Sequence, residues 1–150
     1  NVDGLHRAAG SRELIEIHGR VQELYCTLCD WSEAVLDYAG IETPPGCPRC
    51  GGLVRPNVVL FGEQLPSQAV HRLRAELQRG FDLVFSVGTT SVFPYISEPV
   101  HHTNWSGGWT VEINPGQSEI SHRVKQRIQA GGAAVFEALW KTLRSDQVPD

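Results

Sequence analysis

The chain contains no methionine, not even at position 1, and it has fewer basic than acidic residues, 13 against 17. Because it also starts within what reads as a motif, we expect that it lacks an N-terminal part. The net charge is −4 and no long basic run occurs, so no nucleic-acid-binding surface is predicted. No apolar stretch approaches the roughly 18 residues of a membrane span, and no signal-peptide pattern is present. The sequence therefore predicts partners other than nucleic acids or membranes.

Cysteine is scarce, and the four cysteines form two pairs, Cys26-x-x-Cys29 and Cys47-x-x-Cys50, with 17 residues between the pairs. Four thiolates at this spacing can complete a tetrahedral shell around one Zn²⁺ and leave no position for substrate, which predicts a structural metal. Two disulfides are an alternative, although nothing else indicates secretion. A redox-active Cys-x-x-Cys normally stands alone beside a βαβ unit. The cysteine usage fits a reducing compartment, so we expect a cytoplasmic protein.

The pattern of apolar residues, cysteines, prolines and glycines divides the chain into three segments, residues 1–20, 21–55 and 56–150. In the first, strict alternation over Glu13–Ile17 predicts a short half-buried strand that ends at His18-Gly19. The second segment contains the cysteines. We expect it to consist of strands at residues 21–25 and 53–55 and a loop rich in proline and glycine at residues 40–46.

The third segment has an α/β pattern without internal repeats. Pro66 is suited to open a helix that Gly80 stops, and residues 82–87 form a compact apolar run typical of a buried parallel strand. A second strand is predicted at residues 110–113 and a last helix at about residues 133–144. These elements favour an open parallel sheet, in which ligands bind beyond the carboxyl ends of the strands.

Two short motifs follow the predicted parallel strands. Gly88-Thr89-Thr90-Ser91 offers a close backbone approach and three hydroxyls, which suits a phosphate or a ribose, but such turns are also common structural punctuation. Asn114, before Pro115-Gly116, is suited to bind ribose hydroxyls, yet Asn before Pro is also an ordinary turn starter. No Gly-x-Gly-x-x-Gly follows any strand, so a complete dinucleotide-binding fingerprint is absent.

Of the six histidines, His18 is the best candidate for catalysis. It ends a predicted strand just ahead of the cysteine segment, and imidazole titrates near neutrality, so it can act as a general base. The alternative is a half-buried histidine with a satisfied hydrogen bond. We assign no function to the others, expecting His71 on a solvated helix face and His101-His102 in a loop; the remaining two are His6 and His122.

Taken together, the order of the motifs resembles the sirtuin (Sir2-like) family of NAD⁺-dependent protein deacylases. The matching elements are Asn1-Val2-Asp3-Gly4-Leu5-His6, Ile17-His18-Gly19, the two cysteine pairs, Arg55-Pro56-Asn57-Val58-Val59-Leu60-Phe61-Gly62-Glu63, Val87-Gly88-Thr89-Thr90-Ser91, Val111-Glu112-Ile113-Asn114-Pro115 and a terminal Gly-Ala-Ala before the last helix. The resemblance implies an α/β fold with a Rossmann-like parallel sheet, here incomplete at its N-terminal side. The Rossmann-like domain would comprise residues 1–20, with the active-site segment, and 56–150, and a small zinc-binding domain would be inserted at residues 21–55.

The resemblance also implies functions for individual residues. His18 would be the general base that acts on the ribose hydroxyls, with Asn1 and Asp3 lining the nicotinamide-ribose pocket. The positions implied to bind NAD are Asn1, Val2, Asp3, Gly88, Thr89, Thr90, Ser91, Asn114, Pro115, Gly116 and Ala133. The positions implied to pair as a strand with the acyl-lysine peptide are Val59, Leu60, Phe61 and Gly62. The metal ligands would be Cys26, Cys29, Cys47 and Cys50.

The implied activity is NAD-dependent deacylation of protein lysines, with release of nicotinamide and O-acyl-ADP-ribose and with zinc as a structural ion. The family's first strand and its Gly-Ala-Gly phosphate loop have no counterpart in the sequence. Two alternatives therefore remain open. The chain can be a catalytically incomplete fragment that binds acyl-peptides, or a mono-ADP-ribosyltransferase that uses the same residues up to nicotinamide release.

Overall fold

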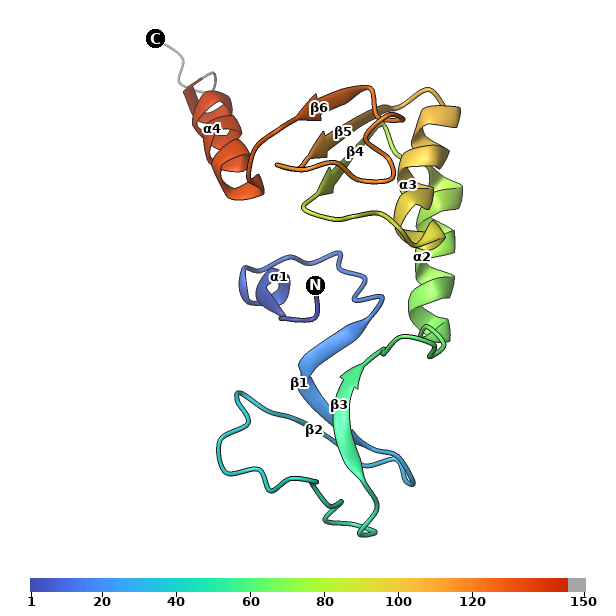
Figure 1. Cartoon of the computed structure of the whole chain (residues 1–150), viewed down its shortest axis with the longest axis vertical. Helices are drawn as coiled ribbons and strands as arrows, with labels where there is room; N and C mark the ends of the chain where they lie inside the picture. The colour runs from blue at the N-terminus through green and yellow to red at the C-terminus, as the bar shows by residue number, and fades with distance from the viewer. Residues whose placement is uncertain (146–150) are drawn as a thin grey trace. The chain divides into compact units, whose positions relative to one another are not determined.

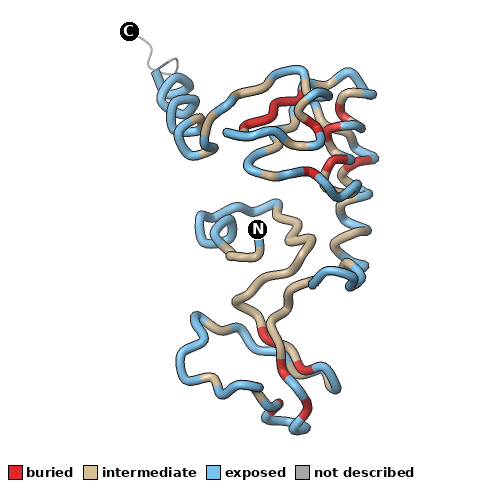
Figure 2. Tube along the Cα trace, viewed as in Figure 1, coloured by how far each residue is buried: buried red, intermediate tan, exposed pale blue. Residues whose placement is uncertain are grey.

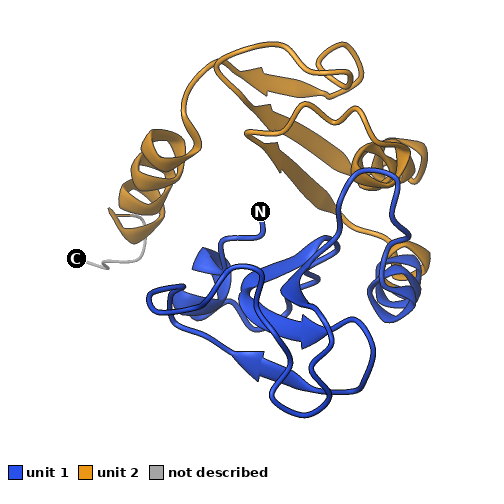
Figure 3. Ribbon diagram, turned by 60° about the horizontal axis from the view of Figure 1, so that its bottom comes forward, with its two compact units in different colours: residues 1–75 blue, residues 76–150 orange. Residues whose placement is uncertain are grey.

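The computed structural model describes residues 1–145, and the chain divides into two compact units, residues 1–75 and residues 76–150 (Figure 3). Among the described residues, no helix is both long and apolar enough to cross a membrane. Each unit is built on its own three-stranded sheet. One sheet is antiparallel and the other parallel, so the units differ in the architecture that supports their loops.

The first unit contains an antiparallel sheet in the order β2–β1–β3 (Figure 1). Its elements are the short helix α1 (Leu5–Ala8) and the strands β1 (Gly19–Cys26), β2 (Ser32–Ala34) and β3 (Val54–Val58). A small core of Leu24, Cys26, Cys47 and Val54 lies at the cysteine end of the sheet, where buried positions appear in red in Figure 2. Trp31 packs against this core. The cysteines are thus part of the core they help to form.

Glycine is required at position 19, where β1 begins. Gly19 has φ +73°, and a Cβ atom built on it would overlap the Asn57 carbonyl oxygen and lie 3.0 Å from the carbonyl carbon. The residue pairs with Val58 in the β1–β3 ladder, and the next Val59 N–H donates to the His18 carbonyl oxygen at 3.0 Å. The missing side chain therefore lets β3 approach the backbone beside His18.

The strand predicted at Glu13–Ile17 is wrong. The backbone groups of this segment form local turns instead, with Ile17 N–H donating to the Ile15 carbonyl at 3.0 Å and Gly19 N–H to Glu16 at 2.9 Å. The predicted strands at residues 21–25 and 53–55 correspond to β1 and the start of β3. Helix α1 and strand β2 were not predicted, because they have only four and three residues and lack a periodic apolar pattern.

The second unit contains a parallel sheet in the order β4–β5–β6, as the α/β pattern predicts. Its strands are β4 (Leu83–Val87), β5 (Trp109–Ile113) and β6 (Gln126–Ile128). The helices are α2 (Ser67–Arg79), which begins in the first unit, α3 (Pro94–Trp105) and α4 (Gly132–Ser145). Helix α2 has the predicted limits: the Pro66 carbonyl accepts the Val70 N–H at 3.0 Å, and Gly80 has φ +80°. The last helix is also confirmed.

Burial differs between the two longer strands. All of β5 except Trp109 is buried, whereas Leu83, Phe85 and Val87 of β4 are 38–47% exposed. The prediction of a buried strand at residues 82–87 is therefore wrong, although its parallel pairing is right. The reason is that Leu83, Phe85 and Val87 share one face of β4, which the described residues cover only in part. Its alternate apolar side chains lie on a face where Phe136 packs against Phe85.

The loop predicted at His101-His102 is also wrong, because both residues lie in α3. The buried positions of this helix are Ser97, Val100 and Thr103, and Pro99 lies inside it. Two of the three inward residues are polar, so the helix shows no apolar periodicity. Sequence reasoning consequently missed α3, and it also missed the three-residue strand β6.

Substitution of Gly19 tests the close approach of β3. We expect Gly19→Ala to lower the free energy of unfolding by about 2–4 kcal/mol, because it combines a positive φ with a steric overlap. Gly40→Ala is the matched control, since Gly40 has φ +77° and no atom within 4 Å of the added Cβ. That control should lose only about 1–2 kcal/mol. Urea unfolding measures both values, and equal losses would contradict the proposed steric contact.

Candidate active site and metal centre

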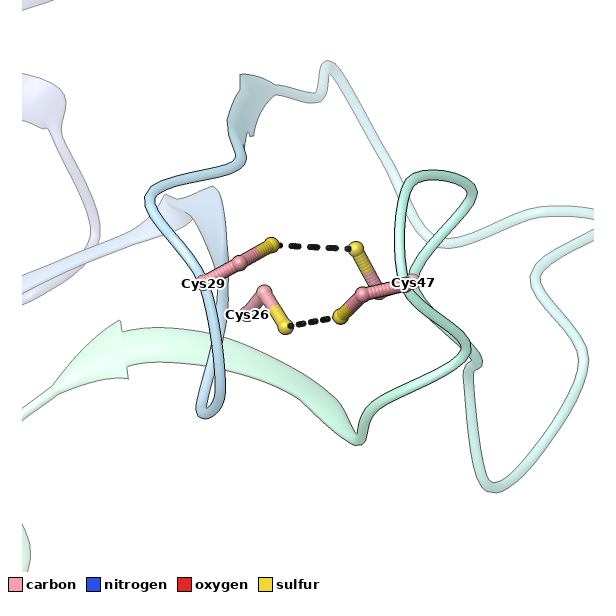
Figure 4. A group of neighbouring side chains, drawn as sticks. Cys26, Cys29 and Cys47 are labelled. Atoms are coloured by element: carbon pink, nitrogen blue, oxygen red, sulfur yellow. Dashed lines mark hydrogen bonds between the residues drawn. The ribbon is translucent and has the colours of Figure 1, made fainter.

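The four cysteines meet in one cluster, and their sulfur atoms all lie within 4.8 Å of one another. The Sγ atoms of Cys26 and Cys50 are 3.5 Å apart, and those of Cys29 and Cys47 are 3.7 Å apart (Figure 4). Zn–S bonds of about 2.3 Å in a tetrahedron separate the sulfurs by about 3.8 Å. A disulfide requires about 2.05 Å. The cluster is therefore compatible with a structural zinc site, and the cysteines are free thiols.

Backbone N–H groups point at the sulfurs of the cluster. Leu28 N–H donates to Cys26 Sγ at 3.3 Å, and Arg49 N–H donates to Cys47 Sγ at 3.4 Å. Gly52 N–H donates to Cys50 Sγ at 3.4 Å, next to Gly51 with φ +72°. Such donors stabilise thiolates. Both Cys-x-x-Cys turns are therefore shaped to hold negatively charged sulfur.

A pocket of about 200 Å³ in the first unit brings together the three predicted catalytic residues, Asn1, Asp3 and His18. Glu16 and His6 also line it. His6 was assigned no function from the sequence, and Glu16 was not considered. Nothing in their local patterns marks them, because His6 lies in the short helix α1 and Glu16 in the turn before β1, and only the folded chain brings both to the pocket.

The first residues are fixed to β1 by two contacts. Val21 N–H donates to the Val2 carbonyl at 2.9 Å, and Gln22 Nε2 donates to the Asp3 carbonyl at 2.5 Å. Gly4, with φ +70°, leaves room for the Gln22 side chain. Gln22 thus positions a predicted catalytic segment. Sequence reasoning missed it, because the contact spans 19 positions of the chain.

The environment of His18 favours a neutral imidazole. The residue is half-buried, and burial lowers the pKa of its side chain below the ordinary value of 6.5. A neutral imidazole can accept a proton near neutral pH. The function of His18 as a general base stays a prediction, with which this lowered pKa is compatible.

Residues Val59–Gly62, expected to pair as a strand with a peptide, do not form a regular strand. Strand β3 ends at Val58, and residues 61–62 form a turn. Val59 N–H donates to His18 and Leu60 N–H donates to the Glu63 carboxylate at 2.9 Å. These two N–H groups are thus already used within the chain. The side chains of Leu60 and Phe61 are 56% and 94% exposed.

The two motifs after the parallel strands meet at the carboxyl edge of the sheet. Asn114 Nδ2 donates to the Thr89 carbonyl at 3.0 Å, and Glu119 N–H donates to the Thr90 carbonyl at 3.0 Å. Gly88, with φ +61°, and Thr90 are exposed. Ser91 differs, being 2% exposed with its Oγ lacking a hydrogen-bond partner among the described residues.

The start of α4 lies at the same edge. A Cβ atom built on Gly132 would lie 2.7 Å from Val87 Cγ1, so the helix begins in contact with the end of β4. Ala133 follows and is exposed. The predicted adenosine-binding positions of the second unit therefore surround one end of its sheet.

A buried carboxylate fixes the loop after β5. Glu112 is fully buried and accepts hydrogen bonds from Ser118, from Ser121 at 2.7 Å and from Arg127 Nε at 2.8 Å. Burial alone raises the pKa of Glu112, but these donors outweigh it and bring the pKa below 4.5. Arg127 also donates to the Gly116 carbonyl. Glu112 thus stabilises the loop that contains Asn114, and a glutamate within the apolar run of β5 was its sequence signal.

Loss of the cysteine cluster should unfold the first unit's sheet. We expect Cys47→Ser to abolish binding of one zinc ion per chain, because structural zinc contributes folding free energy directly. Elemental analysis and hydrogen exchange of β1 and β3 measure the two effects. Thr27→Ser, a conservative change beside the cluster, should retain the metal. An unchanged exchange pattern after complete chelation would show that the cluster needs no metal.

Replacement of Glu112 should destabilise the second unit in a pH-dependent manner. Its folded-state pKa is depressed, so its stabilisation is present above the ordinary value of 4.5 and is lost as the pH falls through the folded value. We expect Glu112→Gln to cost about 3 kcal/mol at pH 7, because Arg127 is left without its buried partner. The deficit should shrink below pH 4.5.

Urea unfolding at pH 7 and at pH 4 measures this deficit. Glu137→Gln is the control, since Glu137 pairs with Lys141 on the exposed surface of α4. A deficit that stays constant across this pH range would contradict the assignment of Glu112 as a buried, ionised carboxylate.

Comparison with known proteins identifies the family. The family model described as the Sir2 family matches residues 1–94. NAD-dependent protein deacylase 2 of Pseudomonas aeruginosa is 50% identical over 127 residues, which cover 83% of this chain and 50% of that protein. The protein of the same name from Pseudomonas syringae pv. tomato is 46% identical over 142 residues, covering 93% and 57%. The chain spans about half the length of the curated relatives it matches.

Solved structures give the same result. A Sir2 homologue in complex with NAD is 35% identical with a TM-score of 0.89, over 97% of this chain and 57% of that one. A structure described as Sir2 with a p53 peptide and NAD⁺ is 31% identical with a TM-score of 0.84, over 95% and 60%. The α/β fold and the resemblance noted from the motifs are thus confirmed: this chain belongs to the Sir2 family.

Proposed function

We propose that this chain is the part of an NAD⁺-dependent protein-lysine deacylase that contains the general base, the structural zinc site and the acyl-peptide segment. The observation that carries the proposal is the pocket that Asn1, Asp3 and His18 line together. Relatives named NAD-dependent protein deacylases support it. The reaction would release nicotinamide and transfer the acyl group from lysine to ADP-ribose, which makes the enzyme a transferase.

The edge of the parallel sheet is suited to the adenosine side of NAD⁺. Gly88 and Thr90 are exposed there, so a ligand can approach the backbone and a hydroxyl. The Asn114 amide uses one donor on Thr89 and accepts from Gly116 N–H at 3.1 Å, which leaves one donor and one lone pair for ribose hydroxyls. Pro115, Gly116 and Ala133 would complete this side. Buried Ser91 would act by shaping the turn.

Within the pocket, His18 would accept a proton from a ribose hydroxyl, because burial lowers the pKa of its imidazole and so favours the neutral form. Asn1 and Asp3 would orient the nicotinamide-ribose end, held in place by the contacts of Val2 and Asp3 with β1. NAD⁺, when bound, would supply the electrophilic ribose carbon and the nicotinamide leaving group. The exposed Leu60 and Phe61, next to Val59 and Gly62, would contact an acyl-lysine peptide.

The metal would have no part in this chemistry. Four cysteine ligands fill a tetrahedral zinc site, so no position remains for water or substrate. The free thiols also support a cytoplasmic location, because a reducing compartment preserves them.

A second candidate function is binding of acyl-peptides without turnover. It is favoured by the exposed side chains of Leu60 and Phe61, which can contact a peptide whether or not NAD⁺ is bound. A mono-ADP-ribosyltransferase would share His18, Asn1 and Asp3 but would leave ADP-ribose on a protein side chain. The three functions therefore differ in the fate of NAD⁺.

Nicotinamide release from NAD⁺, with and without an acetyl-lysine peptide, tests the proposal. We expect peptide-dependent release by the wild-type chain. His18→Ala should form deacetylated peptide roughly 100-fold or more slowly, because the general base is removed. His71→Ala is the matched control, since His71 is exposed on α2. Zinc content should remain unchanged in both variants.

Other outcomes separate the candidates. Folded wild-type chain that binds peptide but releases no nicotinamide would support the binding function and contradict deacylation by this chain. Label from NAD⁺ that stays on protein would identify a transferase of ADP-ribose. Normal turnover in His18→Ala would remove His18 from the mechanism.

A further inference from the structure

Arg55 and Glu63 form an ion pair that spans the end of β3. Arg55 Nη1 donates to Glu63 Oε1 at 2.5 Å, and Nη2 donates to Glu63 Oε2 at 3.1 Å. This two-bond geometry is more specific and stronger than a single contact. The guanidinium carbon lies 5.9 Å from the centre of the Tyr25 ring on β1. The Arg55 side chain thus contacts both Tyr25 of the sheet and Glu63.

Both partners also bind the backbone between them. Arg55 Nη2 donates to the Val58 carbonyl at 3.0 Å, and Leu60 N–H donates to Glu63 Oε2 at 2.9 Å. Glu63 N–H returns a bond to the Leu60 carbonyl at 3.0 Å. These contacts close the segment Val58–Glu63 into one defined turn. The hydrogen bonds from Arg55 and Leu60 lower the pKa of Glu63, so its carboxylate is ionised at neutral pH.

The turn holds apolar side chains in solvent. Phe61 is 94% exposed and Leu60 is 56% exposed, although the backbone between them is held on both sides. Large apolar side chains at a fixed turn are suited to contact an apolar ligand, since the backbone that carries them is already ordered before binding. The same turn is bonded to a residue that lines the pocket, because Val59 N–H donates to the His18 carbonyl at 3.0 Å.

We propose that Arg55 and Glu63 are positioning residues that hold the Val58–Glu63 turn in the shape that binds the acyl-lysine peptide. This inference rests on the proposed deacylase function and names what orders its peptide segment. The pair lies at the Val58 end of β3, whereas the buried core of the sheet lies at its cysteine end. Loss of the pair should therefore disorder the turn and weaken peptide binding without unfolding the sheet.

Peptide affinity and hydrogen exchange together test the proposal. We expect Glu63→Gln to bind a fluorescent acetyl-lysine peptide about tenfold more weakly than the wild-type chain does, because the turn must then be ordered on binding. Arg55→Lys keeps the charge but loses the two-bond geometry, so its affinity for the peptide should lie between those of the wild type and Glu63→Gln. Exchange of the Leu60 amide should rise in Glu63→Gln while that of Val21 in β1 stays slow.

Glu13→Gln is the matched control, because Glu13 forms an exposed ion pair with Arg72 at 2.6 Å in the same unit. It should bind peptide like the wild type. The zinc content and the unfolding midpoint should be the same in the wild type, the control and the other variants. Wild-type affinity in Glu63→Gln, or unchanged exchange of Leu60, would overturn the positioning assignment alone. Failure of the wild-type chain to bind any peptide would instead contradict the proposed function on which the assignment rests.

Discussion

Pairing of β1 with β3 is the interaction on which the rest of the first unit depends (Figure 1). At one end of this ladder, Cys26 pairs with Val54, next to the cysteine cluster. At the other end, Gly19 pairs with Val58, which places His18 beside Val59. The ladder therefore joins the cysteine cluster to the pocket and to the proposed peptide-binding segment. A structural metal in the cluster would in this way contribute to the geometry of the proposed catalytic group.

Polar groups, more than apolar packing, define the loops of both units. In the first unit, the Arg55–Glu63 pair and the Gln22–Asp3 contact hold backbone segments that have few buried apolar side chains. In the second, the buried Glu112 carboxylate organises the loop that contains Asn114. Each of these networks satisfies backbone groups that lie outside helices and strands, which is a requirement for ordered loops near a site.

The sequence predicted the parts of the fold that local chemistry decides. The cysteine spacing predicted the cluster, and Pro66 and Gly80 predicted the limits of α2. The apolar run at residues 82–87 predicted β4. It failed where tertiary contacts decide: the alternating segment Glu13–Ile17 forms turns, and α3 buries Ser97 and Thr103 rather than an apolar stripe. Gln22 and Arg55 act on segments whose contacts become visible only when the strands are paired.

The central structural claim is that the β1–β3 ladder couples the cysteine cluster to His18. Hydrogen exchange of the Val59 amide, which donates to the His18 carbonyl, measures this coupling directly when zinc is added to or chelated from the wild-type chain. We expect Val59 to be protected with zinc and to exchange rapidly without it, in step with the amides of β1. Protection of Val59 that persists while the cysteine end of the ladder exchanges freely would contradict the claim.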